Sequence, residues 1–104
     1  MSFSEETMKA LRNWLGACPR PEQHPADEVR FCLFVAHVWR ERKGLWDESE
    51  ARGIMRATLR ELHPDWRNDE YNERFLEHYE FVGTEILDFL SHLRDNGKLD
   101  MLVV

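Results

Sequence analysis

The chain has 104 residues, of which 42% are hydrophobic and 33% are charged, and its formal net charge at pH 7 is −6. This length is typical of one domain, and the hydrophobic fraction is enough to build a packed core. Nucleic-acid binding would need Lys and Arg in excess, and a membrane span would need an apolar run of about 18 residues. We therefore expect a soluble single domain over residues 1–104 that binds neither nucleic acid nor a membrane.

The start of the chain and its cysteines indicate the cytoplasm. The first fifteen residues contain four charged side chains and no continuous apolar stretch, unlike a secretion signal. Cys18 and Cys32 are the two cysteines, and they form no Cys-x-x-Cys pair. We expect both to be thiols rather than parts of a disulfide framework or a zinc site.

The first predicted helix begins after Ser4, whose hydroxyl can accept a hydrogen bond from a free backbone amide. Glu5 and Glu6 follow at the positive end of the helix, and Pro19 ends it. Apolar residues recur at helical spacing at Met8, Leu11, Trp14, Leu15 and Cys18. The segment is therefore predicted to be amphipathic, with one buried stripe.

The second predicted helix starts at Pro25 and ends in a cationic turn before Gly44. Between them, Phe31 to Trp39 is apolar on every face, and a buried strand is the alternative because Phe, Val and Trp favour sheets. The residues at both ends, which are typical start and stop signals of a helix, favour a helix. A helix that is apolar all round must be enclosed, so we expect this one at the centre of a bundle, enclosed by the other three helices and by the C-terminal tail.

The third predicted helix runs from Asp47 to His63, where the following proline stops it, and the fourth runs from about Asp69 to Asp95. In the fourth, apolar residues at steps of three and four are Tyr71, Phe75, Tyr79, Val82, Ile86, Phe89 and Leu93. A helix of that length is roughly 40 Å long, whereas a compact chain of this size is about 34 Å across. The last helix should therefore bend at Gly83 or protrude.

Together these elements predict an all-α, single-domain, four-helix bundle-like fold with a central hydrophobic helix and an apolar C-terminal tail. Short connections favour packing of helices in sequence order. The tail from Leu99 to Val104 either docks on its own bundle or is captured by a partner, and the sequence leaves both alternatives open.

Two histidines have a carboxylate four residues away on the same helical face: His37 with Glu41, and His92 with Asp88. Such a pair can hold a metal or act as a base with its orienting carboxylate. Metal sites usually need three or four ligands, and the inward Glu-x-x-His pattern of helical dimetal sites is missing. We expect no metal and no other cofactor, and His37, Glu41 and His92 stay the candidate ligands.

Enzymatic chemistry has no motif in this chain. A Gly-x-Ser-x-Gly turn, which would present a nucleophilic serine, is missing, and the glycines are too scattered for a phosphate-binding loop. The sequence therefore predicts a protein without catalytic activity.

Three arginines, Arg52, Arg56 and Arg60, align along one edge of the third helix and precede His63-Pro64-Asp65. A basic helix ending in His-Pro-Asp, then a loop and an aromatic-rich helix, resembles the middle of a J-domain, the co-chaperone module that stimulates the ATPase of heat-shock chaperones. The resemblance covers Asp47 to about Leu90 and implies that the tripeptide contacts the chaperone. The short first helix of that family, with Tyr-x-x-Leu-Gly, is absent. The alternative is that the proline simply ends a helix and Asp65 begins a turn.

Trp46 and Trp66 flank the third helix in loop positions, where tryptophan is more exposed than inside a helix. Tryptophan and arginine dominate the energetics of many interfaces. The predicted docking surface therefore comprises Trp46, Arg52, Arg56, Arg60, His63, Asp65, Trp66 and Arg67. The alternative is that the tryptophans only cover the end of the core.

The function that the sequence favours is a small, non-catalytic, cytoplasmic protein–protein interaction module: an accessory, adaptor or inhibitor protein. Its acidity suits a basic partner protein. Self-association as a homodimer, through the last helix or the C-terminal tail, is a second form of partnership. Two other functions stay open: a J-domain-like co-chaperone that uses His63-Pro64-Asp65, and a helical metal-binding protein with histidine and carboxylate ligands.

Overall fold

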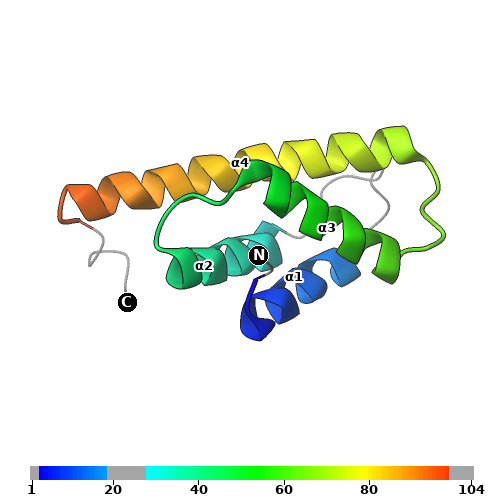
Figure 1. Ribbon diagram of the computed structural model, residues 1–104, viewed down its shortest axis with the longest axis horizontal. Coiled ribbons are helices and arrows are strands. Elements are labelled where there is room, and N and C mark those ends of the chain that lie inside the picture. The colour runs from blue at the N-terminus through cyan, green and yellow to red at the C-terminus, as the bar shows by residue number, and fades with distance from the viewer. Residues whose placement is uncertain (1–2, 19–27, 99–104) are drawn as a thin grey trace.

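The computed structural model describes residues 3–18 and 28–98. Within these ranges lie four α-helices: α1 (Glu5–Ala17), α2 (Glu28–Arg42), α3 (Glu48–Leu62) and α4 (Asp69–Asp95) (Figure 1). The predicted all-α fold of four helices is confirmed. The predicted start at Pro25 and the tail from Leu99 to Val104 lie outside the described residues. In the part that is described, no helix has the length and apolar character needed to cross a membrane.

Three of the helices begin at a side chain that satisfies a free backbone amide. The hydroxyl of Ser4 accepts a hydrogen bond from the Thr7 amide at 3.4 Å, and the Asp47 carboxylate accepts one from the Glu50 amide at 2.8 Å. Asn68 caps α4 in the same way. These caps fix where each helix starts. The sequence predicted those at Ser4 and Asp47, whereas Asn68 was expected only as part of the preceding loop.

The four helices form a ring in which α1 and α4 lie on opposite sides. Each of these two packs against both α2 and α3, whereas α2 and α3 do not pack on each other. The prediction that helices pack in sequence order is therefore wrong for α2 and α3. The link between them runs from the end of α2 to the start of α3 beside α4 (Figure 1), and it carries Trp46, which is buried in the core.

Trp14 of α1 occupies the centre of the core. Its ring centroid lies 4.7 Å from that of Phe31 and 6.1 Å from that of Phe34, both on α2. On α4, Phe75 and Tyr79 lie 5.9 Å and 5.0 Å away. Aromatic pairs at these separations add to the gain from burial. One side chain thus joins α1 to α4 across the bundle.

The second segment is a helix rather than a strand, but only one of its faces is enclosed. The buried residues of that face are Phe31, Phe34, Val35 and Val38. On the opposite face Val29, Cys32 and Leu33 are exposed. The prediction that the three other helices enclose this segment is therefore wrong, because, of the other described helices, α2 contacts only α1 and α4. The C-terminal tail, the other part of the predicted enclosure, lies outside the described residues.

The last helix protrudes and does not break at Gly83. It runs for 27 residues along the longest dimension of the molecule, which measures 45 Å against 27 Å and 22 Å, and its last turns extend past α2 and α3 (Figure 1). Gly83 instead allows close packing. A Cβ atom there would lie 2.5 Å from Cζ2 of Trp46 and closer still to Cη2.

Candidate interaction surface

The arginine edge of α3 mainly holds α3 and α4 together. Nη2 of Arg52 donates to the Glu80 carboxylate at 2.5 Å, and Arg56 donates through Nε and Nη2 to both oxygens of Glu73, at 2.7 and 2.6 Å. Hydrogen bonds from Arg56 hold the pKa of Glu73 below its usual value. Arg60 is exposed and forms no ion pair with another described residue. Two of the three arginines predicted for docking are therefore engaged within the fold.

Trp46 is a core residue, so its predicted place on a docking surface is wrong. Its side chain is 4% exposed, and its Nε1 atom donates to Oγ1 of Thr84 at 2.9 Å. The indole ring covers Gly83 and lies 6.1 Å from the ring of Phe34. The link before α3 therefore carries Trp46 inward, to the place on α4 where Gly83 has no side chain.

His63 joins the α3–α4 turn to α1. Its ring stacks on Trp66 with a centroid distance of 4.1 Å, and its Nε2 atom lies 2.7 Å from the carbonyl oxygen of Leu15. Trp66 is half-buried, and its ring meets that of Phe75 edge-on at 6.3 Å. These contacts give His63 and Trp66 a structural role. For Trp66 this agrees with the alternative interpretation, in which the loop tryptophans cover the end of the core.

The rest of the His63-Pro64-Asp65 corner is open to solvent. Pro64, Asp65 and Arg67 are exposed, and they lie in the turn between α3 and α4. This is the place that the J-domain resemblance implies for the tripeptide. Contact with a heat-shock chaperone stays a prediction.

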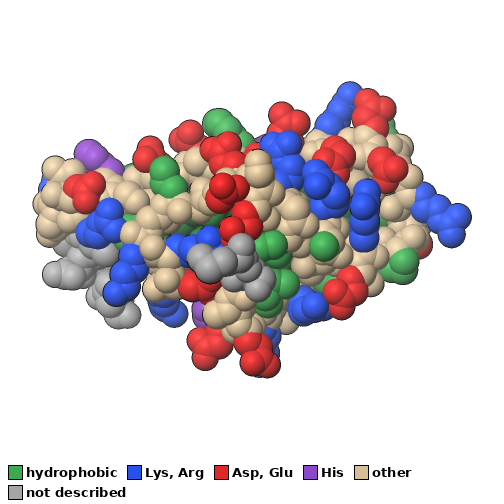
Figure 2. Space-filling view, in the orientation of Figure 1, with side chains coloured by type: hydrophobic (Ala, Val, Ile, Leu, Met, Phe, Trp, Pro, Cys, Tyr) green, Lys and Arg blue, Asp and Glu red, His purple; other side chains and the backbone are tan. Residues whose placement is uncertain are grey.

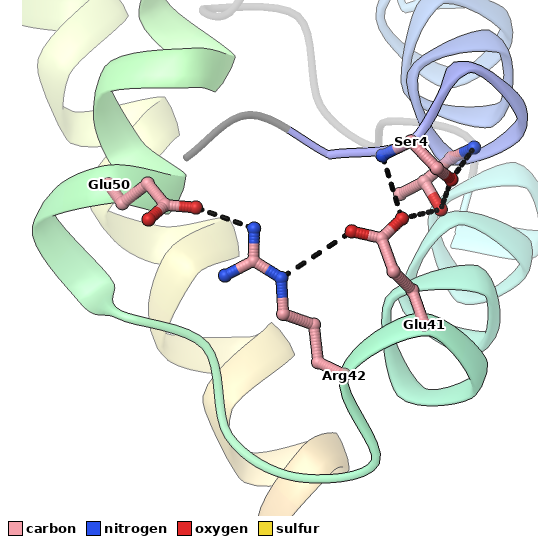
Figure 3. A network of polar contacts seen from close by, with 5 residues as sticks. Ser4, Glu41, Arg42 and Glu50 are labelled. Atoms are coloured by element: carbon pink, nitrogen blue, oxygen red, sulfur yellow. Dashed lines mark hydrogen bonds and ion pairs between the residues drawn. The ribbon is translucent and has the colours of Figure 1, made fainter.

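Glu41 belongs to a polar network that ties three helices together (Figure 3). Its carboxylate accepts hydrogen bonds from the Ser4 amide at 2.8 Å and from the Thr7 hydroxyl at 2.9 Å, while Arg42 bridges it to Glu50 at 3.5 and 2.6 Å. Partial burial raises the pKa of Glu41. The hydrogen bonds from Ser4, Thr7 and Arg42 outweigh that effect and hold its pKa below the usual value. The network fastens the starts of α1 and α3 to the end of α2.

The three candidate metal ligands lie in different parts of the fold. Glu41 lies in the polar network, and His37 is half-buried beside a groove between α1 and α2. His92 lies on the last turns of α4, next to Asn96. Among the described residues no group of three His, Cys, Asp or Glu side chains is placed to hold a metal ion.

A face of α4 that points away from the bundle carries two exposed phenylalanines. Five exposed residues follow one another at steps of three or four, and we call them the outer stripe of α4: His78, Phe81, Glu85, Phe89 and His92. The Phe81 side chain is 62% exposed and that of Phe89 is 56% exposed. Figure 2 shows hydrophobic side chains among charged ones along the edge formed by α4.

The buried stripe predicted for the last helix includes Phe89 and leaves out Phe81. The buried face of α4 is rotated from the predicted one and includes Leu76, Gly83 and Leu87. A signal was available, because Gly83 and the residues four before and after it follow helical spacing. This spacing does not stand out in the sequence, because glycine has no apolar side chain that would mark a buried position.

The carboxylates beside the outer stripe form no ion pair within residues 3–18 and 28–98, although the hydrogen bond to Glu80 and, to a smaller extent, the charge of Glu77 raise the pKa of the Arg52 guanidinium. Glu77, Glu85 and Asp88 are all exposed, and none forms an ion pair with another residue of those ranges. By contrast, Glu73 and Glu80 face α3 and are paired with arginines. Figure 2 shows cations and anions interleaved over α3 and the adjoining part of α4. The negative charge that is left over therefore lies on the outer side of α4.

Phe81 also borders a groove between the start of α3 and the middle of α4. The groove has a volume of about 560 Å³, and Glu48, Glu77 and Glu85 contribute to its wall. Arg52 and Arg74 line it too, but Arg52 is bonded to Glu80 and Arg74 to Glu70. The groove is wide enough for one long side chain of a partner, and its wall holds four carboxylates against two arginines.

A second exposed apolar area lies on α2. Val29 and Leu33 are exposed there, beside a groove of about 470 Å³ between α1 and α2. Its wall mixes both signs of charge, with Glu6 against Lys9 and Arg30. With one carboxylate against two cations, this area lacks the surplus of negative charge found on the outer side of α4.

Comparison with known proteins gives no match to a family model, a curated protein or a solved structure.

Proposed function

We propose that this protein is a small, non-catalytic, cytoplasmic protein–protein interaction module, an accessory, adaptor or inhibitor protein, that docks through the outer stripe of α4. The exposure of Phe81 and Phe89 on one helix face carries this proposal. Complete burial of such a side chain gains about 1.5–3 kcal/mol. In the isolated chain both rings stay in water. A partner that covers them would gain much of the free energy of burying the two side chains.

The platform beneath the stripe supports the same function. Arg52 and Arg56 fasten α4 to α3, and Trp46 packs on the α4 backbone at Gly83. A surface that is already ordered loses little conformational freedom when a partner binds. The α4 face is thus preorganised for docking.

The charge of the stripe favours a basic partner protein. Glu77, Glu85 and Asp88 lie beside the two rings, and the whole chain carries a net charge of −6. Opposite potentials speed the encounter of two proteins and reject partners of like charge. Cys18 and Cys32 are both thiols, which suits the reducing cytoplasm.

Affinity capture from the source cells with three baits tests this function. The first bait is the wild-type chain, the second carries Phe81→Ser with Phe89→Ser, and the third carries Val29→Ser with Leu33→Ser as a matched control on α2. We expect the wild-type and control baits to retain the same partner and the α4 variant to lose it, while all three keep the same helical circular dichroism. Equal capture by all three baits, or loss with the α2 variant alone, would contradict the proposal.

A further inference from the structure

We propose that the docking element of the partner is a basic amphipathic α-helix of about four turns that lies along α4. This inference rests on the proposed function and specifies its partner. The length of the outer stripe, the helical backbone that carries it, its two aromatic rings and its unpaired carboxylates each favour such a helix.

The backbone of α4 determines which kinds of segment can bind. An extended peptide usually gains affinity by pairing its backbone with an exposed sheet edge, and a helix offers no such edge. A segment that satisfies its own amides and carbonyls, as a helix does, therefore suits this face better than an extended peptide. From His78 to His92 the outer stripe spans about 21 Å at 1.5 Å per residue, so a helix of about 14 residues matches its length.

The spacing of the stripe suits helix-on-helix packing. Its members follow steps of three and four residues, which are the ridges that fit into the grooves of another helix. Phe81 and Phe89 are eight residues apart, or about 12 Å along the axis. A partner helix with apolar residues on one face, about two turns apart, would cover both rings.

The carboxylates determine the charge of that helix. Glu77 lies one turn before Phe81 and Glu85 one turn after it, while Asp88 adjoins Phe89. None of the three carboxylates has an ion-pair partner among the described residues. Lys or Arg side chains flanking the apolar face of the partner would meet them on both sides of the rings.

The groove beside Phe81 offers a place for one of these cations. Glu48, Glu77 and Glu85 contribute to its wall, and its volume is about 560 Å³. The alkyl stem of a Lys or Arg can lie against the aromatic ring while its charged end reaches the carboxylates. Such a residue would anchor the register of the two helices.

The same charges argue against a second copy of this chain as the occupant. Pairing two outer stripes would bring the carboxylates of Glu77, Glu85 and Asp88 close to their counterparts. Like charges brought together at an interface suppress association. Of the two modes of self-association that the sequence suggested, the one through the last helix is therefore disfavoured.

Binding of a designed peptide tests the inference. The probe is a labelled peptide of about 16 residues, with Leu on one helical face and Lys on the other, and its control replaces every Lys with Glu. Fluorescence anisotropy gives Kd for the wild type, for Glu77→Gln with Glu85→Gln, for Phe81→Ser with Phe89→Ser, and for Glu5→Gln with Glu6→Gln. The last pair removes the same charge from α1, on the other side of the molecule (Figure 1).

We expect the Lys peptide to bind the wild type, with Kd raised about tenfold by either α4 double variant and by less than about twofold by the α1 variant. The Glu peptide should not bind. Raising NaCl from about 50 to about 300 mM should reduce the effect of the Glu77 and Glu85 changes more than that of the Phe81 and Phe89 changes.

Equal binding of the Lys peptide by all four proteins would show only attraction to an acidic chain and would overturn the inference. The inference would also be overturned if the Lys peptide did not bind, or if the Lys and Glu peptides bound equally well. If the peptide fails while capture from cells still depends on Phe81 and Phe89, the helical basic partner is wrong and the docking function stands. Loss of both results would end both proposals.

Discussion

At the scale of single residues, the tightest constraint is the contact between Trp46 and Gly83. The indole ring lies directly on the α4 backbone, and its Nε1 atom is held by the Thr84 hydroxyl at 2.9 Å. The ring therefore cannot swing away to admit even one extra methyl group. Gly53 offers the opposite case, because it lies in the interior of α3 with no atom within 4 Å of the position of a Cβ.

Substituting each glycine with alanine should therefore give effects of opposite sign. Gly83→Ala should lower the free energy of unfolding by about 1–3 kcal/mol, because the methyl group overpacks the Trp46 contact. Gly53→Ala should raise it by roughly 0.5–1 kcal/mol, because alanine loses less backbone freedom than glycine in a helix. Urea unfolding monitored by circular dichroism measures both. Similar effects of the two substitutions would contradict the Trp46 packing described above.

The same contact shows where residue-level prediction from sequence stops. Trp46 stands in a loop beside a helix cap, a position that fits an exposed anchor as well as a core plug. Its burial depends on Gly83, which is 37 residues away and becomes its neighbour only after α4 has packed. The burial of a loop residue is set by such distant partners, whereas helix caps depend on neighbours three residues away.

At the scale of helices, local signals were sufficient for most boundaries. Ser4 and Asp47 cap α1 and α3 as predicted, and α4 runs from Asp69 to Asp95 as predicted. The faces of the helices were harder to predict. Phe89 shares the spacing of buried aromatic residues, yet it lies on the face of α4 that points away from the bundle and is exposed.

The two ion pairs between α3 and α4 should differ in strength although they look alike. The Arg52 and Arg56 side chains are equally exposed, but Glu80 is 9% exposed and Glu73 is 43% exposed. Arg52→Ala leaves a buried carboxylate without its cation and should cost about 1–3 kcal/mol of unfolding free energy. Arg56→Ala leaves a hydrated carboxylate and should cost about 0–1 kcal/mol. Chemical denaturation compares the two, and an equal or reversed order would contradict the burial of Glu80.

Stability should fall in acid, and Glu41 should contribute to that fall. Its pKa in the folded chain lies below the ordinary value of 4.5, so the folded state is favoured while the carboxylate is charged. This contribution is complete above about pH 4.5 and is lost as the pH falls through the folded pKa. Glu41→Gln should cost about 1 kcal/mol at pH 7 and should flatten the acid limb of the stability curve. Unfolding by urea between pH 3 and pH 7 measures this, and an unchanged acid limb would show that the network of Figure 3 does not hold in solution.

At the scale of the whole molecule, the composition predicted one acidic domain, and the apolar spacing predicted that it is helical. Neither was enough to predict the ring order of the helices or the location of the surplus charge. Both depend on which carboxylates meet arginines after folding: Glu73 and Glu80 are neutralised by α3, while Glu77, Glu85 and Asp88 stay unpaired on the outer side. The same ion pairs therefore occupy two arginines of the predicted docking surface on α3 and leave the carboxylates beside the outer stripe of α4 without a partner in an ion pair among the described residues.

A surface that serves docking rather than folding should tolerate substitution. Phe81→Ser with Phe89→Ser should change the unfolding free energy by less than about 0.5 kcal/mol, as is usual for exposed positions. Thermal or urea unfolding of the purified variant checks this. A loss of several kcal/mol would mean that the two rings stabilise the fold, and the docking role would lose its support.

Photo-crosslinking in the source cells tests the docking face most directly. A benzoylphenylalanine is placed at position 81 on α4 or, as a control, at position 33 on α2, and the cells are irradiated before the chain is recovered. We predict a single covalent adduct with one other protein from position 81 and none from position 33. An adduct from position 33 alone, or none from position 81, would contradict docking through the outer stripe of α4.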